Sequence, residues 1–525
     1  MEREFVLTSR RKALYWVGGI FFTVFALLFI VSLILRPRIS PIAKSKIEAL
    51  LSAKFDSAVT IDTFNVTLFP RITVEAGGLT MRHFGRTDIA PLIQIESLIA
   101  HANWGTLLRA PRHVSSVYIQ GLHIHTPPHE PGEHPKRVWP NQDLASKYQV
   151  LVDVLHADGA SLETTPSKPG KQPRLFDIHH LEMQNLSLDR PSPFHAELTN
   201  PVPKGEIDCT GEFGPWVPED PALTPVRADY TFANADMGTI KALSGIMNSK
   251  GKFGGPLDYL DVSGWTDIPK FQIRSSKMSV PLHTDYKAEV DGTNGDTILK
   301  EVDARFLHSL IVATGEVIRQ DEPRGHLIVV KAVSKGARIE DMLQLAVGND
   351  PPVMNGPMHL NANLEIPVGP QDYLDRMKLK GDFGVDALHF SNLDIEKKVA
   401  SFSNRAQGNP RSDSESTPAT LKGAFDMNNG IIQFSTLHFE VTGASVDLAG
   451  SYGMDNGALD FHGALRMDAK LSQTLTGAKS FFLKAVDPFF SKKGAGTYVP
   501  IKITGTKDHP IYGLDFHRKD KTEIN

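Results

Sequence analysis

The sequence predicts a mainly β protein, in which a single N-terminal transmembrane helix precedes a long array of antiparallel strands with a few short helices. Three observations support this prediction. One uncharged apolar run is long enough to cross a bilayer, apolar and polar residues alternate along much of the remaining chain, and Asn-Gly turns separate some of the alternating segments.

The N-terminal anchor is expected at residues 13–35, which contain no charged side chain. A helix needs ~20 apolar residues to cross a hydrocarbon core of ~30 Å. Arg36-Pro37-Arg38 follows the run directly, whereas a signal peptide has a shorter apolar region and a small-residue cleavage site. We therefore expect an uncleaved anchor. Its expected lipid contacts are Tyr15, Trp16, Phe21, Phe25, Leu28 and Leu35.

The charges that flank the anchor nearly balance. They are Arg3, Arg10, Arg11 and Lys12 before it, and Arg36, Arg38, Lys44 and Lys46 after it. The tight cluster at residues 10–12 favours a cytoplasmic N-terminus, and a long C-terminal domain can be translocated largely regardless of its own charges. We expect the main domain on the extracytoplasmic side.

Composition argues against two classes of protein. A net charge of −4 with 22% charged residues describes an ordinary surface and gives no basic footprint for nucleic acid. Cys209 is the single cysteine, so no intramolecular disulfide can form, which argues against a disulfide-stapled secreted scaffold. A buried thiol is the expected role of Cys209.

The first element after the anchor is a predicted helix at Pro41–Phe55, whose apolar residues share one face. From Val59 onward the period changes to two, which predicts strands. The alternation is clearest near the C-terminus. There the apolar positions are Val446, Leu448, Gly450 and Tyr452, then Leu459, Phe461, Gly463, Leu465 and Met467, then Val499, Ile501 and Ile503. Antiparallel strands with one apolar face are expected.

Turn signals lie between these strands. Asn428-Asn429-Gly430 and residues 454–457 suit tight hairpins. A Gly-x-aromatic unit recurs at irregular spacing, at residues 211–213, 251–253, 381–383, 423–425 and 450–452. Sequential strands are therefore expected to pair, without a fixed-period repeat.

Loops and short helices interrupt the array. Loops are predicted at Thr126–Pro140, Thr165–Arg174 and Asn404–Pro418, and short helices at Thr239–Asn248 and Ile339–Val347. Residues 471–486 form an amphipathic helical pattern with flanking lysines. Such a helix can lie on an anionic membrane surface, or it can close the core of the sheet, which is the commoner role.

Both ends of the chain carry segments in an order typical of one family. Arg36-Pro37-Arg38 is followed by the predicted helix, an alternating strand and Val66-Thr67-Leu68-Phe69-Pro70, and apolar strand residues continue to Ile124. Near the C-terminus, residues 443–450 and 499–506 precede His509-Pro510. This order resembles the AsmA-like family of bacterial inner-membrane-anchored envelope proteins. The resemblance covers about the first quarter and the last fifth of the chain.

The resemblance implies a periplasmic domain built as a long β-sheet curled into a groove, which moves phospholipid toward the outer membrane. The expected regions are 1–12, the cytoplasmic N-terminus; 13–35, the transmembrane helix; 36–125, the AsmA-like N-terminal region; 126–420, the β-rich middle region; 421–516, the AsmA-like C-terminal region; and 517–525, a polar tail. Expected partners are phospholipid, the inner membrane and an outer-membrane or periplasmic protein, with no nucleic acid.

A sheet that is apolar on one face must bury that face against another layer, and few helical segments are available to cover it. Lipid tails could supply this layer. The residues expected to line the groove are Val446, Leu448, Leu459, Phe461, Leu465, Met467, Ile501 and Ile503. The alternative is a closed barrel or a sandwich filled by its own side chains, the usual outcome for alternating strands.

Catalysis is not expected. The strongest candidate for a metal site is a set of histidines and glutamates, namely His123, His125, His129, His134, Glu130 and Glu133. Most of them lie in the proline-rich loop, so a solvated loop is the default interpretation. Asp258 and Asp261 have the spacing of a turn. No nucleophile elbow, phosphate-binding Gly-rich loop or His-Glu-x-x-His helix occurs, so we expect no enzyme and no cofactor.

A third functional class uses the same strands differently. A periplasmic assembly factor could bind nascent outer-membrane proteins by adding one of their strands to an exposed sheet edge. Lipid transport predicts an apolar interior that is open along one side, whereas strand addition predicts an unpaired edge with an ordinary core behind it.

Overall fold

The computed structural model describes most of the chain between residues 39 and 515. The gaps are 54–56, 84–86, 88–89, 108–111, 127–149, 165–173, 188, 216, 218–222, 241–242, 274–275, 277, 293–294, 322–323, 349, 370, 372, 410–415, 455, 471–495 and 508. The predicted anchor, the amphipathic segment 471–486 and nearly all of the two proline-rich loops lie outside the described residues. None of the described helices is long and apolar enough to span a membrane.

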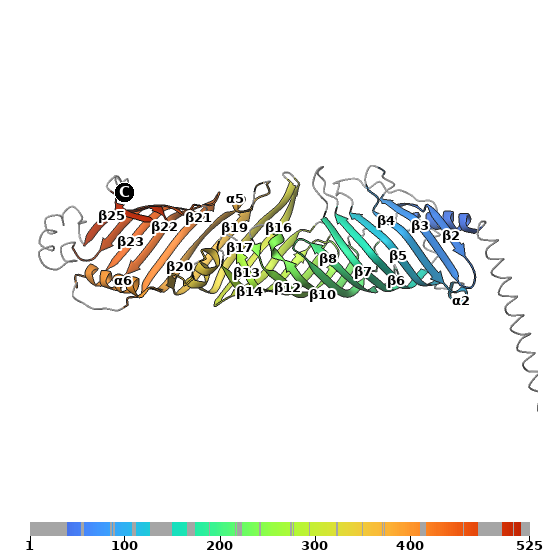
Figure 1. Cartoon of the computed structure of the whole chain (residues 1–525), viewed down its shortest axis with the longest axis horizontal. Coiled ribbons are helices and arrows are strands. Elements are labelled where there is room, and N and C mark those ends of the chain that lie inside the picture. Colours follow the sequence, from blue (N-terminus) through green and yellow to red (C-terminus); the bar gives the residue numbers. More distant parts are fainter. Residues whose placement is uncertain are drawn as a thin grey trace, which may run out of the picture. The chain divides into compact units, whose positions relative to one another are not determined.

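The described residues are mainly β, and their 26 strands form one mixed sheet with few helices. The chain divides into two units, of which the first contains residues 1–233 and 252–257 and the second contains residues 234–251 and 258–525. Figure 1 labels most of the strands and colours them in chain order. Each unit is described in turn.

The first unit begins with a helix at residues 39–53, which confirms the helix predicted there. Its strands are β1 (Ser57–Thr60), β2 (Thr63–Thr67), β3 (Ile72–His83), β4 (Ile93–Ala102), β5 (Arg112–Thr126), β6 (Val150–Thr164), β7 (Arg174–Leu186), β8 (Ser192–Pro201), β9 (Lys204–Phe213) and the start of β10 (Pro225–Asp236). A single turn of helix, α2 (Trp104–Leu107), lies between β4 and β5.

The strands of this unit pair antiparallel with one exception. β1 and β2 both pair with β3, and the order then follows the sequence from β3 to β9. β5 and β6, however, run parallel. The prediction of an antiparallel sheet is therefore wrong at this pair. A parallel pair cannot be joined by a tight hairpin and needs a connection of about a dozen residues or more, and residues 127–149 separate the two strands in the sequence.

The helix at residues 39–53 covers the start of the sheet. Ser40 Oγ accepts a hydrogen bond from Val66 N (3.1 Å), Glu48 Oε1 from Ile61 N (2.9 Å) and Ser52 Oγ from Val59 N (3.0 Å). The apolar side of the helix packs on a core of buried residues from β1 to β6 and the turns between them. Its side chains thus give backbone N–H groups of the first strands the partners that an exposed edge would lack.

The second unit contains the remaining strands. These are β11 (Leu243–Ser244), β12 (Ile246–Pro256, which ends in the first unit), β13 (Leu260–Ile273), β14 (Ser279–Val290), β15 (Thr297–Phe306), β16 (Ser309–Asp321), β17 (Arg324–Arg338), β18 (Met354–Asn355), β19 (Pro357–Ile366), β20 (Lys378–Phe390), β21 (Ala419–Asn428), β22 (Ile431–Val441), β23 (Ala444–Gly453), β24 (Ala458–Met467), β25 (Thr497–Thr506) and β26 (Pro510–Leu514).

From β13 to β17 and from β19 to β26, consecutive strands pair antiparallel, and β17 also pairs with β19. The three predicted C-terminal strands are confirmed as β23, β24 and β25. Asn429 and Gly430 have positive φ angles of 50° and 71°, as a tight hairpin turn requires.

Four helices lie among the described residues of the second unit. They are η2 (Met237–Thr239), α4 (Ile339–Ala346), α5 (Tyr373–Arg376) and α6 (Leu393–Ala406). α4 confirms the helix predicted at residues 339–347. The helix predicted at residues 239–248 is wrong, because Leu243–Ser244 pairs with β13 and Ile246 begins β12. The loop predicted at residues 404–418 is wrong at its start, because residues 404–406 end α6.

Candidate functional site

The eight residues predicted to line a groove lie on one face of β23, β24 and β25. Val446 is directly opposite Leu465, and Phe461 is directly opposite Ile503. Side chains of directly opposed residues share a face, and alternate residues along each strand keep it. Within the chain, Phe461 and Met467 are buried, whereas Val446, Leu448, Leu459, Leu465, Ile501 and Ile503 are only half-buried.

The same apolar face continues through the neighbouring strands. Val446 on β23 is opposite Phe439 on β22, which is opposite Leu421 on β21. Leu421 is in turn opposite Val385 on β20, and Val385 is opposite Met358 on β19. The register therefore joins seven consecutive strands, β19 to β25, into one apolar surface.

A row of phenylalanine rings runs across this surface. The ring centroids of Phe383 and Phe425 are 6.3 Å apart, those of Phe425 and Phe434 are 6.5 Å apart, and those of Phe434 and Phe461 are 5.7 Å apart. The recurring Gly-x-aromatic unit helps to build the row, because Phe383 lies opposite Gly423. A Cβ at Gly423 would come within 2.6 Å of the Phe383 ring, so glycine makes room for it.

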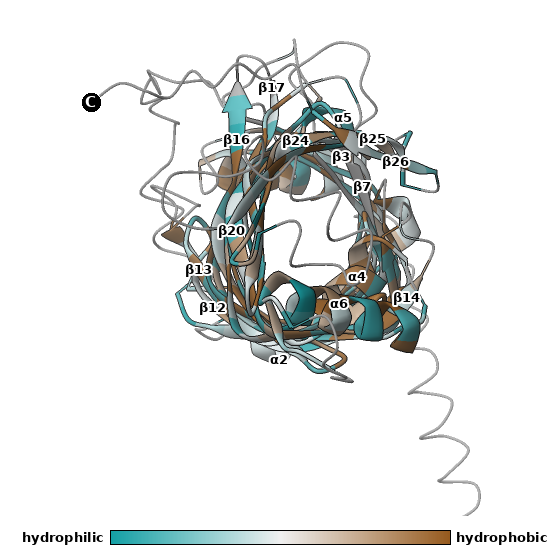
Figure 2. Cartoon of the chain, turned by 90° about the vertical axis from the view of Figure 1, so that its left-hand side faces the viewer, coloured by the Kyte–Doolittle hydropathy of each residue, from teal (hydrophilic) through white to brown (hydrophobic). Residues whose placement is uncertain are grey.

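One end of the apolar face is covered by helices. α6 contributes Val399 and Phe402, and α4 contributes Leu343, to a core built on Val385 and Leu388. Figure 2 shows α4 and α6 against the inner side of the strands. Leu388 and Val385 are 1% and 0% exposed. At this end the apolar face is therefore an ordinary protein core.

Buried carboxylates fix these two helices to the sheet. Asp341 of α4 accepts hydrogen bonds from His308 N (2.9 Å) and Ser309 Oγ (2.7 Å). Glu396 of α6 accepts from Phe390 N (2.8 Å) and Ser416 Oγ (2.6 Å). Each carboxylate lies in the first turn of its helix, where it also interacts favourably with the helix dipole.

Burial opposes the ionisation of Glu396. The hydrogen bonds from Ser416, His389 and Phe390 N outweigh burial and hold the pKa of the Glu396 carboxyl below its usual value. Glu396 is therefore ionised at neutral pH, in the state that accepts all three hydrogen bonds.

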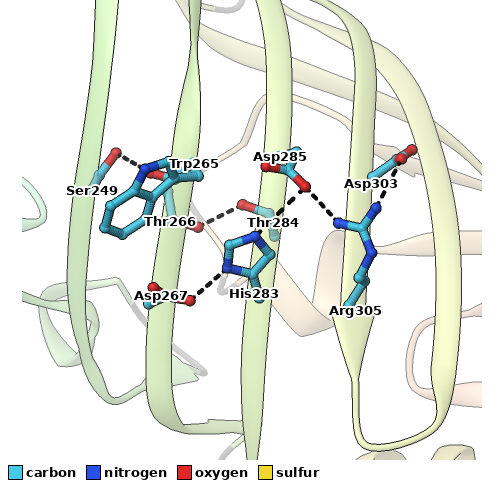
Figure 3. Close-up of polar contacts among 9 residues, drawn as sticks. All are labelled: Ser249, Trp265, Thr266, Asp267, His283, Thr284, Asp285, Asp303 and Arg305. Carbon is cyan, nitrogen blue, oxygen red and sulfur yellow. Dashed lines mark hydrogen bonds and ion pairs between the residues drawn. The ribbon is translucent and has the colours of Figure 1, made fainter.

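The opposite face of the sheet is polar and carries pairs of oppositely charged side chains. In the second unit, His283 Nδ1 lies 2.6 Å from Asp267 Oδ1, and Arg305 pairs with both Asp285 and Asp303 (Figure 3). The hydrogen bond from Arg305 is the main cause that lowers the pKa of Asp285, and His283 adds to it while slight burial opposes it. One face of this sheet is thus polar, and the other is apolar.

The metal site considered at residues 123–134 is not assembled by the described residues. His123 Nδ1 lies 2.6 Å from Ser161 Oγ, and His129, Glu130, Glu133 and His134 lie outside the described residues. Asp258 lies in the turn that precedes β13, and Asp261 lies within that strand. Cys209 is a buried free thiol, as predicted, and burial raises its pKa to about 11.

Sequence reasoning missed two groups of residues. Phe434 completes the ring row but belongs to no Gly-x-aromatic unit, and only the register of β22 reveals it. A group of histidines and carboxylates on β6 and β7 also comes together only through strand register.

Comparison of the chain with protein-family models, with curated proteins and with solved structures gave no match. The residues themselves therefore carry the functional argument.

Proposed function

We propose that this chain is an envelope-biogenesis protein that binds phospholipid acyl chains in an apolar β-groove and helps to move lipid between the inner and outer membranes. In this proposal the chain is a single-pass protein of the bacterial inner membrane, with its N-terminus in the cytoplasm and its main domain in the periplasm. The AsmA-like features of the sequence support it.

One structural observation carries the proposal. The apolar face from β19 to β25 is continuous, yet several of its large side chains remain half-buried within the chain. Leu448, Leu459 and Ile501 are not fully buried by the chain, and they do not lie on the polar face of the sheet. Acyl chains have the chemistry to complete their burial.

The energetics suit reversible transfer. Each buried methylene contributes ~0.8 kcal/mol, so one acyl chain of ~16 carbons would gain on the order of 10 kcal/mol relative to water. A membrane interior offers nearly the same gain. The free energy of moving an acyl chain from a bilayer into the groove is therefore close to zero, as reversible transfer by a carrier requires.

The test compares two double variants of the full chain, purified in mild detergent. Val446→Asp with Leu448→Asp places two charges on the apolar face of β23. Ser445→Asp with Ala449→Asp places the same two charges on the opposite face of that strand, across from Arg466 and His462. Native mass spectrometry and lipid extraction then measure bound phospholipid.

We expect the wild type and the Ser445/Ala449 variant to retain phospholipid, and the Val446/Leu448 variant to lose most of it while its circular dichroism stays unchanged. Equal lipid content in the two variants, or a folded wild type without lipid, would reject the proposal.

A second function, strand addition by a periplasmic assembly factor, is favoured by one observation. The last described strand, β26, pairs with β25, and its Ile511, Tyr512 and Leu514 are 63%, 74% and 44% exposed. Exposed apolar strands of this kind are templates for a further strand. Crosslinking from residue 512 to a nascent outer-membrane protein, with no phospholipid bound by the chain, would favour this function over lipid transport.

A further inference from the structure

A row of aromatic rings crosses the polar face of the first unit. Tyr118 on β5 stacks on His156 of β6, with ring centroids 5.2 Å apart and an angle of 16° between the planes. The row continues to His180 on β7, 6.2 Å from His156, and to His195 on β8, 6.1 Å further. Because side chains alternate along strands, this row lies on the face opposite Leu155, Ala157 and Leu181, which belong to the first unit's core.

Two histidines of this row converge with a carboxylate. His156, His180 and Glu182 each offer one ligand atom, and these atoms all lie within 4.8 Å of one another. His156 Nδ1 lies 3.7 Å from Glu182 Oε2. The register explains the convergence, because Glu182 is directly opposite His156 and His180 is directly opposite Asp158.

The neighbours of the three side chains orient them. Asp158 Oδ1 lies 2.7 Å from His180 Nδ1, which leaves the His180 Nε2 atom for a different partner. Gln184 Nε2 donates to Glu182 Oε1 over 2.8 Å, while the other carboxylate oxygen faces His156. A carboxylate on the far nitrogen of a metal-binding histidine is the usual outer partner in zinc sites.

We propose that His156, His180 and Glu182 bind a divalent transition metal of the zinc class, with Asp158 and Gln184 as the outer residues that orient the ligands. Two imidazoles and one carboxylate are a ligand set that zinc uses in proteins. Ligand atoms ~2.0–2.2 Å from a tetrahedral zinc lie ~3.4 Å apart, so the observed separations need only small side-chain rotations.

The surroundings fit an open metal site. The side chains of His156, His180 and Glu182 are 26%, 34% and 30% exposed, so water can occupy a remaining coordination position. Three protein ligands plus a water is the arrangement of reactive zinc sites rather than closed structural ones.

Two comparable histidines serve as controls. His283 of the second unit lies between Asp267 and Asp285, but the ring that stacks on it is that of Trp265 rather than a second histidine (Figure 3). A second group consists of His195, Glu197 and Asp208, and it contains one imidazole instead of two. Both test whether any histidine paired with carboxylates on this sheet binds metal equally well.

The experiment titrates Zn²⁺ into the full chain, purified in detergent and stripped with a chelator, in competition with a chromophoric chelator. The variants are His156→Gln, His180→Gln, Glu182→Gln, Asp158→Asn, His195→Gln and His283→Gln. We expect one site in the wild type, a loss of affinity of at least tenfold on removal of any of the three ligands, and a ~10- to 100-fold loss for Asp158→Asn. His195→Gln and His283→Gln should change affinity less than twofold.

A second measurement reports the ligands directly. Co²⁺ in place of Zn²⁺ should give visible absorption typical of four or five ligands in the wild type, and this absorption should be absent in His180→Gln, while circular dichroism stays unchanged. The proposal would be overturned if His156→Gln bound zinc as tightly as the wild type. It would also be overturned if His283→Gln lost as much zinc affinity as the ligand variants. Neither outcome depends on lipid binding.

Discussion

The two ends of the apolar face in the second unit differ in how they are covered. Where α4 and α6 pack, Leu388 and Val385 are fully buried in an ordinary core. Along β23 and β25, Leu448 and Ile501 share that face but are only half-buried. The same alternating pattern therefore builds a fully buried core at one end and a half-buried apolar surface at the other. Helical cover, rather than strand composition, makes the difference.

Replacement of a core residue at the covered end should have the largest effect on stability. Leu388→Ala removes a side chain that is 1% exposed, and such changes lower the free energy of unfolding by about 2–5 kcal/mol. Leu448→Ala on the half-buried end should cost less than half as much. Chemical denaturation followed by circular dichroism measures both, and equal losses would contradict the comparison.

Removal of a carboxylate that fixes a helix to the sheet should have the next largest effect on stability. Glu396→Gln weakens the acceptor for Phe390 N and Ser416, at a cost of about 1–3 kcal/mol at pH 7. Because the pKa of Glu396 is lowered by folding, its stabilisation is present above its usual pKa and is lost as the pH falls through the lowered pKa. Denaturation midpoints of the wild type and the variant should converge in acid, and a constant gap would exclude this role for the carboxylate.

Replacement of a ring in the phenylalanine row should change the amount of bound phospholipid more than it changes stability. Phe434→Leu removes two ring contacts, each worth ~0.5–1.5 kcal/mol, but keeps an apolar side chain on the face. We expect reduced phospholipid in the purified full chain and a loss of only about 1 kcal/mol in the free energy of unfolding, because leucine keeps an apolar contact. Phe402→Leu, on α6, is the matched change at the covered end and should leave lipid content unaltered.

The smallest effect is expected next to the last strands. The hydrogen bond with Asp515 raises the pKa of His462, Asp460 adds to this, and burial opposes it. The stabilisation is therefore full below the usual histidine pKa and is lost as the pH rises through the raised value. Because His462 is 41% exposed, the gain is screened and should stay below ~1 kcal/mol. Asp515→Asn should flatten this pH dependence of the thermal midpoint; an unchanged slope would contradict it.

Local patterns predicted the elements whose signals are local. Alternation located β23 to β25, and Asn429-Gly430 located their neighbouring turn, because both depend on adjacent residues. α6 was missed because its polar sequence resembles a loop, although Asn392 caps it and Glu396 anchors it. The Asn392 cap is a local signal, whereas the Glu396 contacts involve Phe390 of β20 and Ser416, which no local pattern reveals.

Features that depend on strand pairing could not be predicted from the sequence. The parallel β5/β6 pair depends on the direction in which the chain returns after residue 126, and the spacing of apolar residues is the same in either direction. Likewise, His156 and Glu182 are far apart in the chain and meet only because the register of β6 and β7 places them opposite each other.

Nearest-neighbour pairing has a consequence for how such a chain can change in length. From β21 to β26 each described strand bonds only to its neighbours along the sequence, so a hairpin could be inserted or deleted at a turn without disturbing the pairing of distant strands. Two strands added together restore the direction of the chain at the point of insertion. Duplication of hairpins would therefore lengthen the apolar face in uniform steps, much as a repeat protein grows.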